Sequence, residues 1–92
     1  MTIKLSKNAS KFLDSVTEKE KNRIREKVKK LFISLDQNGI IPFKEMDIKK
    51  LEGEWNGFMR MRIGKNRVIF KIDGLNKELL IYEIDNRGSV YK

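Results

Sequence analysis

The feature that most constrains this fold is an alternation of apolar and charged side chains in the last third of the chain. Between Gly57 and Tyr91, three alternating runs are separated by glycine-containing turns. A period of two is typical of β-strands that bury one face, and short connections of this kind join neighbouring antiparallel strands. The pattern therefore predicts a three-stranded antiparallel meander with one apolar face and one charged face.

The strand register follows from keeping the apolar side chains on one face. Pairing Arg62 with Arg67 across the first turn satisfies this condition. Pairing Ile72 near Glu78 across the second turn then brings Arg67 opposite Glu83. The third run places Leu80, Tyr82 and Ile84 on the apolar face. The residues predicted for the charged face are Arg60, Arg62, Arg67, Glu83, Asp85 and Arg87.

The charged face holds four of the six arginines of the protein. Arginine binds phosphate through a planar fork of donors that is always charged. Like charges placed opposite each other cost a few tenths to about 1 kcal/mol each, so a purely structural face would favour alternating signs. We interpret this face as a phosphate-binding surface. An ordinary salt-bridged solvent face is the alternative.

Two amphipathic helices are predicted before the meander. Ser6 and Asn8 are good caps for a first helix, and Thr17 with Glu20 forms the capping-box pattern for a second. A short strand, Ile3–Leu5, precedes them. Their apolar stripes are Ala9, Phe12, Leu13 and Val16, then Ile24, Val28, Leu31, Phe32 and Leu35.

The second helix is predicted to end near Gly39, before Pro42. The segment from Phe43 to Trp55 shows no regular period, and we expect an ordered loop with one short turn. Trp55 is interpreted as an anchor in the core or at the sheet edge. Base stacking is the alternative for a lone tryptophan beside a basic loop.

Length and composition limit the possible functions. With 92 residues the chain is expected to form one α+β domain spanning residues 1–92, whose helices cover one face of the sheet. The charge of +8 predicts a polyanionic partner, either nucleic acid or an acidic protein. Cysteine and histidine are absent, which excludes disulfides, thiolate chemistry and the usual zinc ligands.

No carboxylate cluster suggests a metal site, and we expect neither a metal nor another cofactor. The amino terminus lacks the apolar core of a signal peptide, and no run approaches the ~20 apolar residues of a membrane span. A cytoplasmic, soluble protein without membrane contact is therefore expected.

Four segments together resemble the RelE/ParE superfamily of toxins from bacterial and archaeal toxin–antitoxin systems. They are Lys50–Gly53, Gly57–Gly64, Asn66–Phe70 and Asn86–Tyr91. The resemblance implies a RelE-like fold and a ribosome-dependent endoribonuclease that cleaves mRNA and inhibits translation. It also implies a cognate antitoxin as partner, besides the ribosome and mRNA. The alternatives are a ParE-like inhibitor of DNA gyrase and a non-catalytic RNA-binding relative.

The resemblance also implies roles for individual residues. Arg67, Arg87 and Tyr91 match catalytic positions, and Arg60 and Arg62 match basic positions of the second strand. Lys50 and Lys65 are expected to attract RNA through their positive charge. Asn86 stands where many relatives carry histidine, which leaves the proton-transfer group open. The candidates for that group are Tyr91, which we favour, Glu83, Asp85 and Lys50.

Overall fold

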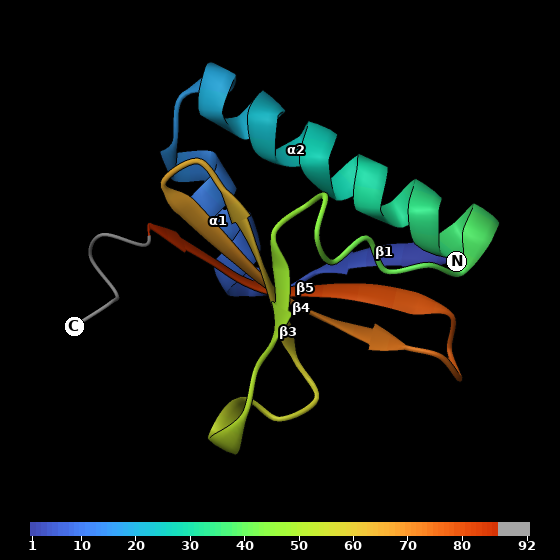
Figure 1. Cartoon of the computed structure of the whole chain (residues 1–92). Coiled ribbons are helices and arrows are strands. Elements are labelled where there is room, and N and C mark those ends of the chain that lie inside the picture. Colours follow the sequence, from blue (N-terminus) through green and yellow to red (C-terminus); the bar gives the residue numbers. More distant parts are fainter. Residues whose placement is uncertain (87–92) are drawn as a thin grey trace.

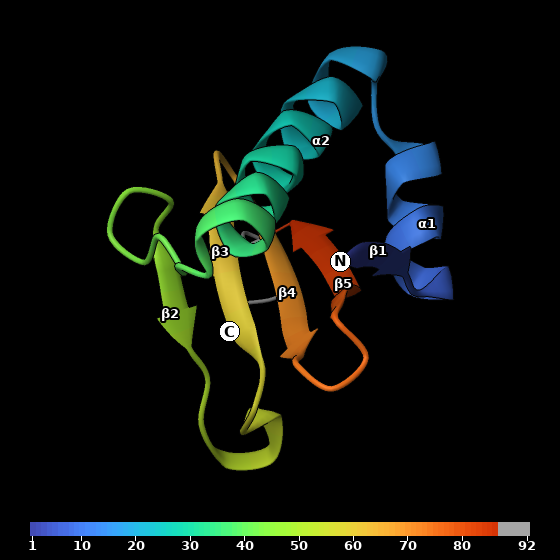
Figure 2. The same cartoon turned by 90° about the vertical axis from the view of Figure 1, so that its right-hand side faces the viewer.

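The computed structural model describes residues 1–86, which form a five-stranded mixed sheet with two helices on one of its faces (Figures 1 and 2). This arrangement confirms the predicted α+β fold. The elements are β1 (Thr2–Leu5), α1 (Lys7–Ser15), α2 (Glu18–Ile33), the π-helical turn η1 (Ser34–Asn38), β2 (Ile48–Lys50), the 3₁₀ turn η2 (Gly53–Trp55), β3 (Met59–Ile63), β4 (Asn66–Asp73) and β5 (Glu78–Asn86).

The strands lie in the order β1-β5-β4-β3-β2. The predicted meander is present as β3, β4 and β5, and β1 adds to its β5 edge as a parallel strand. The prediction of a loop from Phe43 to Trp55 was wrong in one respect, because this segment contains β2, which pairs antiparallel with β3. A strand of only three residues is too short to show a period of two.

Both predicted helix starts are confirmed. The Ser6 hydroxyl accepts a hydrogen bond from the Ala9 backbone N–H at 3.1 Å, and the Thr17 hydroxyl accepts one from Glu20 at 3.2 Å. Gly39 ends the η1 turn in the left-handed conformation, with φ of 64°. Each cap satisfies backbone groups that lack a partner within the helix.

The core lies between the helices and one face of the sheet. In Figure 2, α2 crosses that face, while α1 packs beside β5. The helices and η1 contribute Ala9, Leu13, Ile24, Leu31 and Leu35, and the strands contribute Ile48, Met59, Met61, Ile63, Val68, Phe70, Leu79, Ile81 and Ile84. Burial of each large apolar side chain contributes about 1.5–3 kcal/mol, so this layer provides the main stabilisation of the fold. Within residues 1–86, no helix has both the length and the apolar character needed to cross a membrane.

The register between β3 and β4 agrees with the prediction, because Arg62 lies opposite Arg67. The predicted register between β4 and β5 was wrong. Arg67 lies opposite Asp85 rather than Glu83, since the hairpin begins by pairing Asp73 with Glu78. Further along β5, the pairing with β4 shifts by one more residue.

This shift is a β-bulge at Tyr82. Phe70 is paired with Ile81 and the adjacent Ile69 with Glu83, so Tyr82 is the extra residue of β5. A bulge interrupts the alternation of faces. Leu79, Ile81 and Ile84 therefore all lie in the core, whereas the sequence pattern placed Leu80, Tyr82 and Ile84 together.

Candidate functional site

The face of the sheet turned away from the helices is the candidate site, and we call it the outer face. Its side chains alternate along β3 and β4 with those of the core, so their positions follow from the register. One row runs across the sheet near the β3–β4 turn. It consists of Asp47, Arg62, Arg67 and Asp85, because Arg62 pairs with Arg67, Arg67 pairs with Asp85, and the Arg62 N–H donates to the Asp47 carbonyl at 3.2 Å.

In this row a carboxylate flanks each of the two central arginines. Arg67 and Asp85 form a bidentate pair, in which Nε donates to Oδ1 at 3.3 Å and Nη2 donates to Oδ2 at 3.1 Å. Their side chains are only 13% and 12% exposed. Charge-assisted pairs of this geometry are stronger than neutral hydrogen bonds, so they orient the guanidinium within the sheet face.

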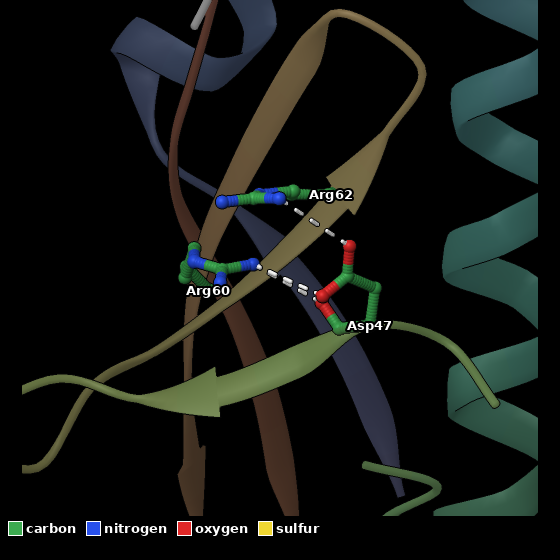
Figure 3. Close-up of polar contacts among 3 residues, drawn as sticks. All are labelled: Asp47, Arg60 and Arg62. Atoms are coloured by element: carbon green, nitrogen blue, oxygen red, sulfur yellow. Dashed lines mark hydrogen bonds and ion pairs between the residues drawn. The ribbon is translucent and has the colours of Figure 1, made fainter. Parts of the chain in front are cut away.

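Asp47 contacts two arginines of β3, Arg60 and Arg62 (Figure 3). The Arg60 guanidinium donates to the Asp47 carbonyl at 3.3 Å and lies 3.5 Å from its carboxylate, while Arg62 Nη1 is 3.9 Å from the same carboxylate. The Arg60 side chain is 5% exposed and that of Arg62 is 39% exposed. Arg62 is therefore the more accessible guanidinium, and Arg60 ties β3 to the start of β2.

The next row across the outer face consists of Lys49, Arg60, Ile69 and Glu83. Burial raises the pKa of the Glu83 carboxyl, and its hydrogen bond and proximity to Asp85 raise it further, against the opposing charge of Arg67. Glu83 therefore keeps its proton to a higher pH than an exposed glutamate. A carboxyl tuned in this way is better suited to proton transfer near neutral pH.

An aromatic cluster occupies the end of the outer face where β3 begins. The ring centroid of Trp55 lies 5.5 Å from that of Phe58 and 5.6 Å from that of Tyr82, and the centroids of Phe58 and Tyr82 are 5.2 Å apart. Lys71 Nζ lies 5.5 Å from the centre of the Phe58 ring. Trp55 and Tyr82 remain 37% and 40% exposed, so the cluster presents open aromatic surface.

The structure brings together only part of the predicted site. Arg62 and Arg67 are adjacent on the outer face, and Lys65 lies in the turn that joins their strands. The expectation that Arg60 contacts RNA directly is not supported, because its side chain is buried against Asp47. Arg87 and Tyr91 lie outside the described residues, so their predicted roles stay predictions.

Lys50 is separated from the arginines. It pairs with Met59, a core residue, and its ammonium lies 6.0 Å from the Phe43 ring. Lys49, its neighbour, pairs with Arg60 and shares the outer face instead. Lys50 is therefore a poor candidate for proton transfer beside Arg67.

Sequence reasoning missed Asp47, which contacts two of the arginines. Asp47 has a φ of 51°, and it precedes a strand too short to be recognised from its pattern. Within the part of the chain that the structure describes, no group of three or more potential ligands is placed to hold a metal ion.

No protein-family model matches the sequence, and no curated protein matches it closely. Solved structures do match its fold. The RelE–RelB complex of Pyrococcus horikoshii OT3 contains a chain with 28% identity and a TM-score of 0.73, and the match covers 95% of this chain and 94% of that one. The RelB–RelE complex of Methanococcus jannaschii gives 21% identity and 0.69, with 97% and 95% covered.

A third match is YafQ from Escherichia coli, with 18% identity, a TM-score of 0.67, and 98% and 97% of the two chains covered. These likenesses extend over nearly the whole of each chain, so they compare complete folds rather than a shared motif. They agree with the order of elements and the sheet described above. The chain therefore has the fold of the RelE-like toxins, and these structures support its placement in the RelE-like toxin superfamily.

Proposed function

We propose that this protein is the toxin of a toxin–antitoxin system and that it cleaves mRNA on the ribosome as a metal-independent endoribonuclease. The observation that carries the proposal is the direct pairing of Arg62 and Arg67 on the face of the sheet that the helices leave uncovered. The likeness to RelE and YafQ chains supports the same reading. Two adjacent guanidinium groups suit a substrate with successive phosphates.

In the proposed reaction, the ribose 2′-oxygen attacks the adjacent phosphorus and the bond to the 5′-oxygen breaks. The 2′-hydroxyl proton goes to a base, and the leaving 5′-oxygen gains a proton. Arg67 stabilises the charge that develops on the phosphorane, and Arg62 binds a flanking phosphate. Arg87 is predicted to act on the leaving side, together with Tyr91.

Glu83 is our choice for the proton-transfer group among the described candidates. Asp85 is engaged by Arg67 through two hydrogen bonds, and Lys50 belongs to the opposite face. The raised pKa of Glu83 places it nearer to neutral pH than an ordinary glutamate. Arginine cannot serve as the base because it does not lose its proton in proteins.

Two partners are proposed, the ribosome and an antitoxin that binds a second surface. A site that has no metal and only a weak base needs another body to hold the RNA in position for in-line attack. We propose that the ribosome does this. An apolar groove of about 740 Å³ between β1, α1 and α2 suits an amphipathic acidic segment of an antitoxin. Its floor includes Leu13, Ile24 and Ile81, and basic side chains such as Lys21 and Lys29 line it.

Primer extension on mRNA from cells that express the chain tests the proposal. Wild-type protein should produce cuts within translated codons, and Arg67→Ala should abolish them. Arg25→Ala, which removes an exposed arginine from α2, is the matched control and should leave the cuts unchanged. Loss of DNA supercoiling without mRNA cuts would favour a gyrase inhibitor. If neither effect appears, the chain is a binding protein or an inactive relative.

A further inference from the structure

We infer that Trp55, Phe58 and Tyr82 form a stacking platform for unpaired bases of RNA, which orients the strand whose phosphates meet Arg62 and Arg67. This inference rests on the proposed function and adds the substrate feature that it recognises. The interplanar angles within the cluster are 87°, 72° and 59°, so no two rings stack face to face. The rings of Trp55 and Tyr82 thus keep surface that another flat group can cover.

The β-bulge explains why this aromatic surface exists. Tyr82 is the extra residue of β5, and it stands on the outer face next to Glu83 rather than in the core. The bulge is tied to the start of α1, where the Ser6 hydroxyl donates to the Tyr82 carbonyl and the Ser6 N–H donates to Ile81 at 3.0 Å. Two hydrogen bonds from Ser6 therefore hold the backbone beneath the platform.

Cations accompany the aromatic rings. Lys71 and Lys4 both lie beside Leu80, one from β4 and the other from β1, so they flank the same end of the outer face. Lys71 is also within 5.5 Å of the Phe58 ring centre. Aromatic rings for bases with cations for the backbone are the combination that single-strand binders use.

The platform and the row that contains Arg62 and Arg67 lie on one continuous face. Lys71 and Arg67 are four residues apart on β4 and point the same way, which separates them by about 13 Å at the rise of a strand. Figure 2 places η2 at the end of β3 remote from the β3–β4 turn. A single strand could therefore run lengthwise, with its bases over the rings and its phosphates toward the arginines.

A single strand fits this surface better than a duplex or a peptide. Bases in a duplex are already stacked on one another, so their flat faces are not available. An acidic peptide would satisfy the lysines but has no need of exposed rings. Bases and phosphates together account for both kinds of side chain.

The test uses Trp55, the only tryptophan of the protein, as its own reporter. Short single-stranded RNA should quench its fluorescence, and a matched abasic strand of equal charge should bind more weakly without quenching it. Trp55→Ala and Tyr82→Ala should each weaken RNA binding about tenfold, as expected for the loss of one stacked base. Trp55→Phe should retain most of the affinity.

Leu75→Ala is the control, because Leu75 is 97% exposed and lies in the β4–β5 turn. It should leave RNA affinity and fluorescence unchanged. Equal binding of the abasic strand, or unchanged affinity after Trp55→Ala, would refute the platform. A Trp55→Ala protein that binds RNA normally but loses its antitoxin would show that the rings serve a protein partner instead. Quenching by RNA without mRNA cuts in cells would uphold the platform and refute the nuclease.

Discussion

At the scale of single residues, the outer face is shaped by carboxylates as much as by arginines. Asp85 accepts hydrogen bonds from Nε and Nη2 of Arg67, and Asp47 contacts Arg60 and Arg62 from the other side. These acids reduce the repulsion that paired arginines would otherwise suffer. They also mean that a phosphate has to compete with a resident carboxylate for Arg67.

Asp85→Asn should release Arg67 for RNA. The binding of short single-stranded RNA should strengthen, and the slope of log affinity against log salt should steepen by about 0.7 for one added phosphate contact. The free energy of unfolding should fall by about 1–3 kcal/mol, because a largely buried guanidinium loses its ionised partner. Asp14→Asn makes the same charge change at an exposed position of α1 and should alter neither urea unfolding nor the salt slope. An unchanged slope in Asp85→Asn would mean that Arg67 does not take up a phosphate.

Glu83 should make stability depend on pH. Its pKa is raised by folding, so the folded state binds this proton more tightly than the unfolded chain, whose ordinary value is 4.5. The resulting stabilisation is complete below that value and is lost as the pH rises through the raised pKa. Glu83→Gln should therefore match the wild type in acid and exceed it at neutral pH in urea unfolding. A neutral-pH stability below that of the wild type would contradict this assignment.

At the scale of elements, the bulge in β5 decides which side chains reach each face. Leu79 and Ile81 face the core before it, and Ile84 faces the core after it, although the spacing changes from two residues to three. Tyr82 is the residue that absorbs this difference. The core therefore tolerates the bulge because both halves of the strand keep their apolar side chains inward.

Deleting Tyr82 should leave the protein folded. The remaining order alternates regularly, so Ile81 and Ile84 stay in the core and Asp85 still meets Arg67. Inserting an alanine after Glu83 should unfold the domain instead, because it turns Ile84 outward and Asp85 inward. Thermal unfolding followed by circular dichroism compares the two. If the deletion is as damaging as the insertion, the bulge is required for folding and not only for placing Tyr82.

At the scale of the whole molecule, the sheet separates the apolar core from the candidate chemistry. The two helices cover one face and build the core, as Figures 1 and 2 show, while the arginine row and the aromatic rings lie on the other. Exposed side chains on the outer face, such as Arg62 and Tyr82, can therefore change without disturbing the packing of the core. This division of roles is what lets a domain of this size carry a binding face on a sheet that it also needs for folding.

The sequence by itself determined the helix caps, the apolar stripes and the pairing of Arg62 with Arg67. These features depend on residues close together in the chain, so local periods and turn residues are sufficient to predict them. The resemblance to RelE-like toxins in the last forty residues also agreed with the fold. Local patterns were less informative wherever an element was short, as with β2.

Only the tertiary structure decided which groups meet on the outer face. The β4–β5 register depends on one extra residue, Tyr82, whose carbonyl accepts a hydrogen bond from Ser6, 76 residues away in the sequence. Asp47 reaches Arg60 and Arg62 only because β2 pairs with β3, and Arg60 is buried as a consequence. Such contacts join distant parts of the chain, and their energies depend on burial and charge that no local pattern records.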